Sequence, residues 1–326
     1  MSHAFNFADL TPDLQLDALQ SIGFYADSGL LALNSYENRV YQFRADDGKR
    51  YVAKFYRPER WSDAQILEEH QFALDLVTAE VPVVAPIARD GVTLHHFSGY
   101  RFALFPSCGG RPFEMDNLDQ FEQLGRYLGM LHQVGSQRPF QARPQIDLRQ
   151  DIARASQQLL QSRWLPAHLA QPLQQVLKAA QSQVPAMSGS SIRCHGDCHA
   201  GNLLCNERLT LLDLDDALQG PPITDFYLLL SGDRHDQLVQ LDVLLEQYEN
   251  FFHLPQSQLA WLEALKLRRM ITYMAWLDLR WGDAAFQQAF PWFSQASYWQ
   301  QQVSELEQQV KRLDLPALSL GLSDSW

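Results

Sequence analysis

The chain has 326 residues, enough for one large or two ordinary domains with a substantial core. Hydrophobic residues make up 46% and charged residues 20%, as in globular proteins, and the net charge of -12 argues against a nucleic-acid-binding surface, which would be basic. Four cysteines are too few for a disulfide framework, so we expect reduced thiols and a cytoplasmic location. Residues 1–6 lack the features of a signal peptide, and no uncharged apolar run is long enough to span a membrane, so we expect no membrane partner.

The first third of the chain mixes helix and strand signals. Capping residues and a following glycine or proline predict two helices, over about 12–22 and 63–79. Segments rich in β-branched and aromatic residues predict strands at 30–33, 39–43, 51–56 and 100–105. We therefore expect a small β-rich N-terminal part.

Lys54 lies inside the apolar strand predicted at 51–56. One interpretation is a lysine whose ammonium reaches solvent from a half-buried strand. The other is the lysine that holds the α- and β-phosphates in kinases, fixed by a glutamate of the next helix. That helix carries Glu68 and Glu69, and we predict Glu69 as the partner because it shares the apolar face of the helix.

After about residue 116 the periodicity becomes helical, with segments predicted at 116–132, 148–160 and 165–183, and again to about 313. Gly125 and Gly129, four residues apart, predict close helix packing. His132, at the end of the first of these segments, is expected to be a structural histidine. We predict an N-terminal ATP-binding lobe over 1–106 and a C-terminal catalytic and substrate lobe over 107–326.

The stretch from His195 to Asn202 carries the strongest chemical signal. Asp197 and Asn202 are five residues apart, the spacing found in the catalytic loop of protein kinases. In that chemistry one carboxylate orients and deprotonates an incoming hydroxyl, while an amide oxygen and a second carboxylate hold Mg²⁺ against the phosphates. Asp197 suits the first task, and Asn202 and Asp213 suit the second.

The residues around Asp213 predict a hairpin that ends at this aspartate, beside the loop of Asp197. Taken singly, these polar residues could be turn residues, caps or solvated acids. Taken together in this order they favour a functional site, because charged residues bracketed by apolar strands seldom arise for packing alone. Further on, Asp225 could cap a helix, brace the loop of Asp197 from below, or do both.

The order of Lys54, Glu69, His132, the pattern His-Gly-Asp-x-His-x-Gly-Asn at 195–202, and Asp213 resembles the aminoglycoside phosphotransferase/choline kinase family. The resemblance covers about residues 30–281, and the HGDxHxGN pattern is its specific part. Within the family, segments 33–41 and 54–61 are similar to bacterial serine/threonine protein kinases of the stress response.

This resemblance implies an α+β, bilobal, protein-kinase-like fold and an ATP-dependent kinase that uses Mg²⁺ and phosphorylates protein hydroxyls, including its own. It implies Asp197 as proton acceptor, Asn202 and Asp213 as Mg²⁺ ligands, and Asp213 as part of the catalytic set. It also places Lys54 with Glu69 at the phosphates and Ser35 beside ATP, at the tip of the phosphate-covering loop.

The sequence departs from eukaryotic kinases in three places, one of which is that residues 216–221 are too few for a eukaryotic-type activation segment. Residues 34–39 contain no G-x-G-x-x-G pattern, and Leu214-Asp215 replaces the Phe-Gly that follows the metal aspartate. These departures leave open a small-molecule kinase acting on an amino alcohol, an aminoglycoside or a sugar. A third hypothesis is a zinc module, whose candidate ligands are Cys194, His195, Cys198, His199 and Cys205, although their spacing lacks the usual Cys-x-x-Cys pair.

Overall fold

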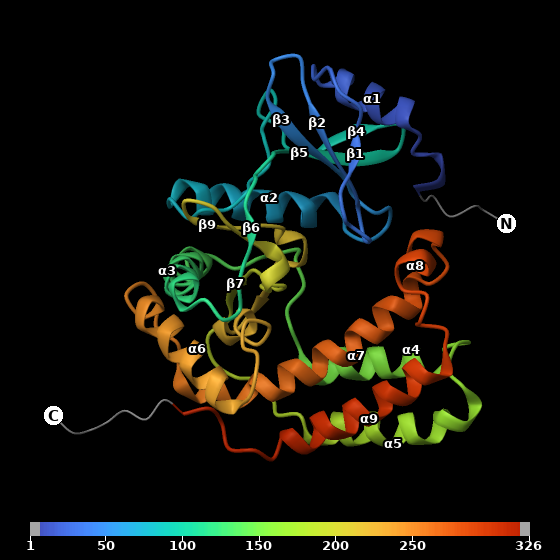
Figure 1. Ribbon diagram of the computed structural model, residues 1–326, viewed down its shortest axis with the longest axis vertical. Helices are drawn as coiled ribbons and strands as arrows, with labels where there is room; N and C mark the ends of the chain where they lie inside the picture. The colour runs from blue at the N-terminus through green and yellow to red at the C-terminus, as the bar shows by residue number, and fades with distance from the viewer. Residues whose placement is uncertain (1–6, 320–326) are drawn as a thin grey trace. The chain divides into compact units, whose positions relative to one another are not determined.

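The computed structural model describes residues 7–319 (Figure 1). Residues 1–6, where we expect no signal peptide, lie outside this range. The chain divides into two compact units, each described by itself: unit 1 comprises residues 7–114, 140–143 and 200–217, and unit 2 comprises 115–139, 144–199 and 218–319. Among residues 7–319, every helix is too short or too polar to cross a lipid bilayer.

Unit 1 is built around an antiparallel sheet that, in the described part of the chain, has the strand order β1-β2-β3-β5-β4. Its elements are α1 (Pro12–Ser21), β1 (Leu31–Ala32), β2 (Arg39–Arg44), β3 (Arg50–Phe55), α2 (Asp63–Thr78), β4 (His95–Phe97), β5 (Tyr100–Pro106), β6 (Arg111–Pro112), β8 (Leu203–Cys205) and β9 (Leu209–Leu211). The last three form a separate small sheet in the order β6-β8-β9. The predicted helices and strands of the first third are therefore confirmed to within about two residues, while β4 and β6 were not predicted.

The two faces of the five-stranded sheet bury different side chains. Ala53 and Phe55 of β3 belong to a core cluster that includes residues of α1, such as Leu19. Tyr56 belongs instead to a second cluster with Ile66 of α2. Because side chains alternate between the faces of a strand, Lys54 is directed to the α2 face.

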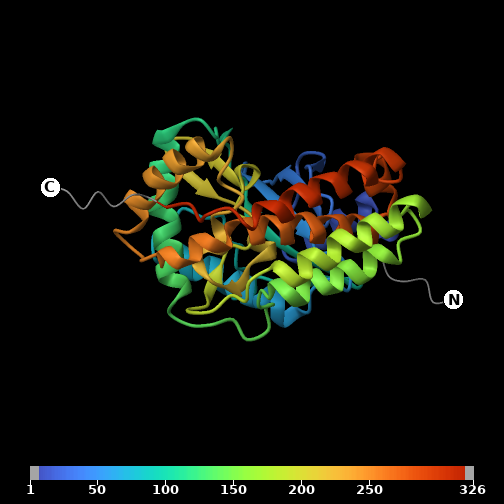
Figure 2. The same cartoon turned by 90° about the horizontal axis from the view of Figure 1, so that it is seen from below.

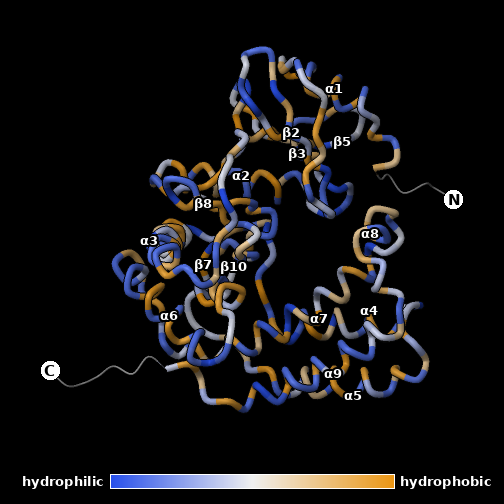
Figure 3. Tube along the Cα trace, viewed as in Figure 1, coloured by the Kyte–Doolittle hydropathy of each residue, from blue (hydrophilic) through white to orange (hydrophobic). Residues whose placement is uncertain are grey.

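Unit 2 is mainly helical. Its elements are α3 (Leu118–Gly135), α4 (Leu148–Leu160), α5 (Ala170–Gln183), β7 (Ile192–Cys194), β10 (Leu218–Gly220), α6 (Arg234–Tyr248), α7 (Leu262–Arg280), α8 (Ala284–Ala289) and α9 (Ala296–Arg312). Helix α4 packs on α5 and α7, and α9 packs on the same two helices, so the four run side by side in Figure 2. Hydrophobic and hydrophilic residues alternate along these helices in Figure 3, as expected for helices with one buried face.

A second helix pair in unit 2 depends on glycine. A Cβ atom on Gly125 of α3 would lie 2.1 Å from the carbonyl oxygen of Leu244 in α6, and one on Gly129 would lie 2.6 Å from that of Tyr248. Only glycine permits this approach of the two backbones, so the predicted role of both glycines is confirmed. Strand β7, which leads into the His195 stretch, pairs with β10 and contacts α3.

Candidate active site

Lys54 is buried in β3 and faces three carboxylates of unit 1. Its Nζ lies 2.9 Å from Asp213 Oδ1, 3.2 Å from Asp215 Oδ1 and 4.0 Å from Glu69 Oε1. Burial lowers the pKa of Lys54, but the three carboxylates outweigh burial and hold that pKa well above its usual value. The ammonium is therefore charged at neutral pH, and the interpretation of Lys54 as a solvent-reaching lysine is wrong.

The two neighbouring glutamates of α2 have different surroundings. Glu69 is buried and lies within ion-pair distance of Lys54, as expected. Burial raises the pKa of Glu69, Lys54 opposes this shift, and Asp215 adds to it. Glu68 accepts hydrogen bonds from the backbone N–H groups of residues 141–143, at 2.7–2.9 Å, and so fixes that segment.

Asn202 and Asp213 flank the same end of the β8–β9 hairpin in unit 1. Leu203 pairs with Leu211, and the Leu212 N–H donates to the Asn202 carbonyl over 2.9 Å. Asp213 adopts a left-handed conformation with φ of 55°, which Asp tolerates better than most residues, and its side chain is 52% exposed. Amide and carboxylate oxygens are donors that hard divalent cations take, so the chemistry of this pair fits a divalent metal ion.

Asp197 belongs to unit 2 and is the third residue after the end of β7. Gly196 before it has φ of 83°, the left-handed region that glycine enters without strain. One carboxylate oxygen of Asp197 lies 3.0 Å from Arg269 Nη2, and the other lies 3.4 Å from His199 Nε2. Burial raises the pKa of Asp197, but the His199 hydrogen bond and the Arg269 charge outweigh it, and the net pKa is lowered. The Asp197 carboxylate is therefore ionised at neutral pH.

The backbone before Asp197 is held by Asp225. The Asp225 carboxylate accepts the N–H of His195 at 2.7 Å and that of Gly196 at 2.8 Å. It also lies 3.0 Å from His132 Nε2, and the other ring nitrogen of His132 lies 2.7 Å from the Tyr248 hydroxyl. Of the two roles considered for Asp225, bracing the loop is the one that these contacts bear out, and His132 is structural as predicted.

Ser35 lies in the segment between β1 and β2 and is half-buried. The carbonyl of its neighbour Tyr36 accepts hydrogen bonds from Arg57 at 3.0 Å and Arg39 at 3.2 Å. The segment is therefore held by arginine side chains, and the place of Ser35 beside a nucleotide stays a prediction.

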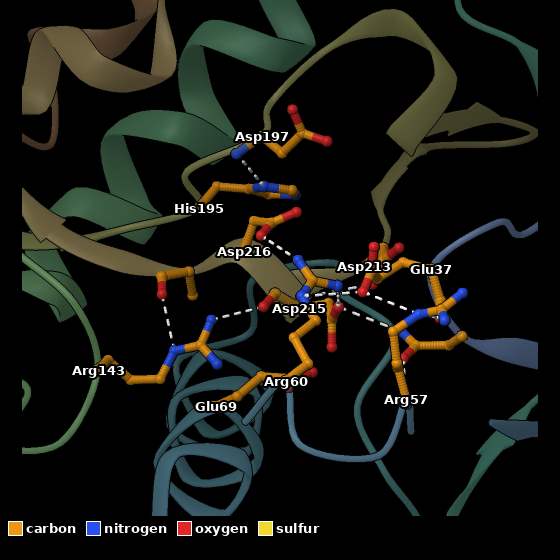
Figure 4. A network of polar contacts seen from close by, with 12 residues as sticks. Glu37, Arg57, Arg60, Glu69, Arg143, His195, Asp197, Asp213, Asp215 and Asp216 are labelled. Atoms are coloured by element: carbon orange, nitrogen blue, oxygen red, sulfur yellow. Dashed lines mark hydrogen bonds and ion pairs between the residues drawn. The ribbon is translucent and has the colours of Figure 1, made fainter. Parts of the chain in front are cut away.

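Sequence reasoning missed the partners of Asp215. Figure 4 shows that its carboxylate meets Arg60 and that Arg143 donates to its backbone carbonyl over 2.6 Å. Arg60 is 155 residues away in sequence, and no motif links the two positions. The acidic pair Asp215-Asp216 inside a buried segment was the one available signal.

The zinc hypothesis is not supported. Among residues 7–319, the group of His, Cys, Asp and Glu side chains close enough to share a metal ion is His132, Cys194 and Asp225. It contains one of the five proposed zinc ligands, and its histidine and aspartate already bond each other. The four cysteines are free.

Comparison with known proteins defines the class. The sequence profile of the phosphotransferase enzyme family matches residues 30–265, more than half of the chain. The chain therefore belongs to this phosphotransferase family, and the predicted kinase class of enzyme is confirmed.

Two relatives from Salmonella and Escherichia coli carry the likeness to particular proteins. The chain is 47% identical over 296 residues to the "Serine/threonine protein kinase RdoA" of Salmonella typhimurium strain LT2, covering 89% of both proteins. It is 46% identical over 295 residues to the "Stress response kinase A" of Escherichia coli K12, again covering 89% of each. The predicted likeness to bacterial stress response kinases is thus confirmed.

Solved structures confirm the kinase-like α+β fold. An amicoumacin kinase, hAmiN, in complex with AMP-PNP, Ca²⁺ and Ami, matches with a TM-score of 0.72 at 18% identity, covering 93% of this chain and 94% of that one. A microcompartment-associated aminopropanol kinase matches with a TM-score of 0.69 at 21% identity, covering 94% and 99%. At these identities the similarity concerns the fold alone.

Proposed function

We propose that the chain transfers the γ-phosphate of ATP to serine and threonine hydroxyls of proteins, including its own. The relatives named as serine/threonine kinases support this acceptor class. The observation that carries the chemistry is Asp197, an aspartate kept ionised by Arg269 and His199 in a loop braced by Asp225. Such a carboxylate can orient a hydroxyl and accept its proton.

Asp197 accepts the proton of the acceptor hydroxyl, whose oxygen bonds to the γ-phosphorus. The bond between that phosphorus and the β,γ-bridging oxygen breaks, and ADP leaves with its electron pair. Lys54, fixed by Glu69, would hold the α- and β-phosphates, and Ser35 would lie beside ATP.

Asn202 and Asp213 would hold Mg²⁺, which when bound neutralises charge on the β- and γ-phosphates. The proposed proton acceptor Asp197 and the proposed metal ligand Asn202 are five positions apart in the sequence, so one short segment carries both roles. The division at residue 106 into an ATP-binding lobe and a catalytic lobe remains part of this proposal. So does a cytoplasmic location, which the free thiols favour.

The experiment is mass spectrometry of the protein after incubation with Mg-ATP, alone and with a generic protein such as casein. We expect phosphoserine or phosphothreonine on the chain and on the added protein, and neither with Asp197→Ala. The matched control is Asp233→Asn, at an exposed helix cap. Absence of phosphorylated protein from a wild type that binds Mg-ATP would overturn the proposed acceptor class.

A small-molecule hydroxyl is the alternative acceptor. Tyr273 and Trp276 follow Arg269 by one and two turns of α7 and are half-buried, and their ring centres lie 5.4 Å apart with the ring planes tilted by 30°. Aromatic faces attract cationic amines. A screen of amino alcohols, aminoglycosides and sugars, with ADP release as the readout, distinguishes a small-molecule acceptor from a protein acceptor. If the acceptor is a protein, none of these compounds should raise ADP release above the rate measured with ATP and enzyme alone.

A further inference from the structure

Asp215 is a buried carboxylate on which three segments of unit 1 converge (Figure 4). Oδ2 accepts from Asn38 Nδ2 at 3.1 Å and forms an ion pair with Arg60. Oδ1 lies 3.2 Å from Lys54 Nζ. Asn38 comes from the segment between β1 and β2 that is proposed to cover the phosphates (the phosphate-covering segment). Lys54 comes from β3, and Arg60 from the stretch before α2.

Asn38 links this carboxylate to the backbone of the phosphate-covering segment. Its own Oδ1 accepts the N–H of Arg57 at 3.0 Å. The Arg57 guanidinium in turn donates to the carbonyls of Glu37 at 2.8 Å and Tyr36 at 3.0 Å. Three consecutive residues are therefore held by side chains. This explains how a segment without the usual glycines can keep one backbone conformation.

The backbone N–H and carbonyl of Asp215 contact the segment that carries Asp213. The Asp215 N–H donates to Asp213 Oδ1 at 3.4 Å, and its carbonyl accepts from Arg143 Nη2 at 2.6 Å. Arg143 also donates to the carbonyl of Ala217 at 2.8 Å, so the turn after Asp213 is fixed on both sides. The backbone contacts of Asp215 therefore lie directly beside the left-handed Asp213.

We propose that Asp215 is a positioning residue that couples the phosphate-covering segment 35–38 to the metal-binding aspartate Asp213. This inference rests on the proposed function, which gives those two segments their nucleotide and metal. Both oxygens of Asp215 already face protein cations or an amide, so its role is distinct from that of a metal ligand. The two segments thereby reach their nucleotide-binding positions together.

The test compares Asp215→Asn with Asp216→Asn. Asp216 is the next residue and has the same cationic partner, since Arg60 Nη2 lies 2.5 Å from its Oδ1, but its side chain is 43% exposed. Hydrogen exchange of the amides of residues 34–39 is measured, together with the Kd for Mg-ATP and for ATP without metal. Losing one hydrogen bond to a charged group costs about 1.5–3 kcal/mol, which changes an opening or binding equilibrium constant about tenfold or more.

For Asp215→Asn we expect about tenfold faster exchange in residues 34–39 and about tenfold weaker binding of ATP both with and without the metal. Asp216→Asn should stay within about twofold of wild type. Asn38→Ala is the second variant, because it removes the link while leaving the buried carboxylate with Lys54 and Arg60. It should reproduce the faster exchange even if Asp215→Asn does not fold.

Unchanged exchange in Asn38→Ala would overturn the proposal. A loss in Asp215→Asn confined to the metal-dependent part of ATP binding would also overturn it, since that result marks a metal ligand. Exchange and binding need no phosphate transfer. If the wild type shows no kinase activity, but exchange in residues 34–39 still becomes faster in both variants, the proposed function is contradicted and this inference stands.

Discussion

The Asp225→Asn substitution tests how the loop before Asp197 is held. The carboxylate is 1% exposed and its two oxygens serve three donors: two backbone N–H groups, of His195 and Gly196, and the His132 ring. Burial alone raises the pKa of Asp225, yet the His132 hydrogen bond leads the interactions that lower it overall. An asparagine offers one oxygen in place of two, and its NH₂ must face a donor.

The expected loss follows from these contacts. Removing one charge-assisted hydrogen bond costs about 1.5–3 kcal/mol, and a buried N–H left without an acceptor costs a further ~1–3 kcal/mol. We therefore expect Asp225→Asn to lower the free energy of unfolding by about 3–5 kcal/mol, a large part of the stability of an ordinary domain. The kcat should fall as well, because Asp197 follows the loosened backbone directly.

Urea unfolding followed by tryptophan fluorescence measures the loss. The matched control is Asp233→Asn, because Asp233 also accepts two backbone N–H groups, at 2.8 and 3.0 Å, but on the surface at the start of α6. Asparagine caps helices as well as aspartate does, so the control should change little. Equal stability of the two variants would refute the reasoning from a buried, fully used carboxylate.

Three further substitutions probe other parts of the chain. Burial is the main cause that lowers the pKa of His70 to about 3, so between pH 6.5 and pH 3 the unfolded state binds a proton that the folded state does not. The free energy of unfolding should therefore fall by about 1.4 kcal/mol per pH unit as the pH drops from 6.5 toward 3. His70→Gln should flatten that slope in acid-unfolding curves. Gly125→Ala should cost about 1–3 kcal/mol in urea unfolding, because its Cβ meets the α6 backbone, whereas Gly282→Ala, in open space, should cost far less. Arg269→Gln should raise the pKa of Asp197 and move the acid limb of the kcat/KM profile to higher pH; an unmoved limb would contradict the assigned base.

Local patterns were enough to predict most of the elements and the class of enzyme. The capping box at Ser62 and Gln65 predicted the start of α2, and the structure contains both of its hydrogen bonds. The apolar face of α2 distinguished Glu69 from Glu68 because burial follows helical periodicity. The HGDxHxGN pattern identified the phosphotransferase class because its spacing is rarely reproduced by packing alone.

Contacts between distant segments could not be predicted in this way. Asn38 and Asp215 are 177 residues apart, and Lys54 and Asp213 are 159 apart. Periodicity describes one element at a time, so it places Lys54 in an apolar strand but indicates neither its burial nor which carboxylates surround it. Short strands such as β4 were missed for a related reason, since three residues carry too little alternation.

The most direct measurement is phosphate transfer by Asp197→Asn alongside the affinity of the same variant for Mg-ATP. We expect transfer to protein hydroxyls to fall about 10²–10⁴-fold while the Kd for Mg-ATP stays near that of the wild type, because the role proposed for Asp197 is to accept a proton and not to hold the nucleotide. Transfer at the wild-type rate by this variant would contradict the account.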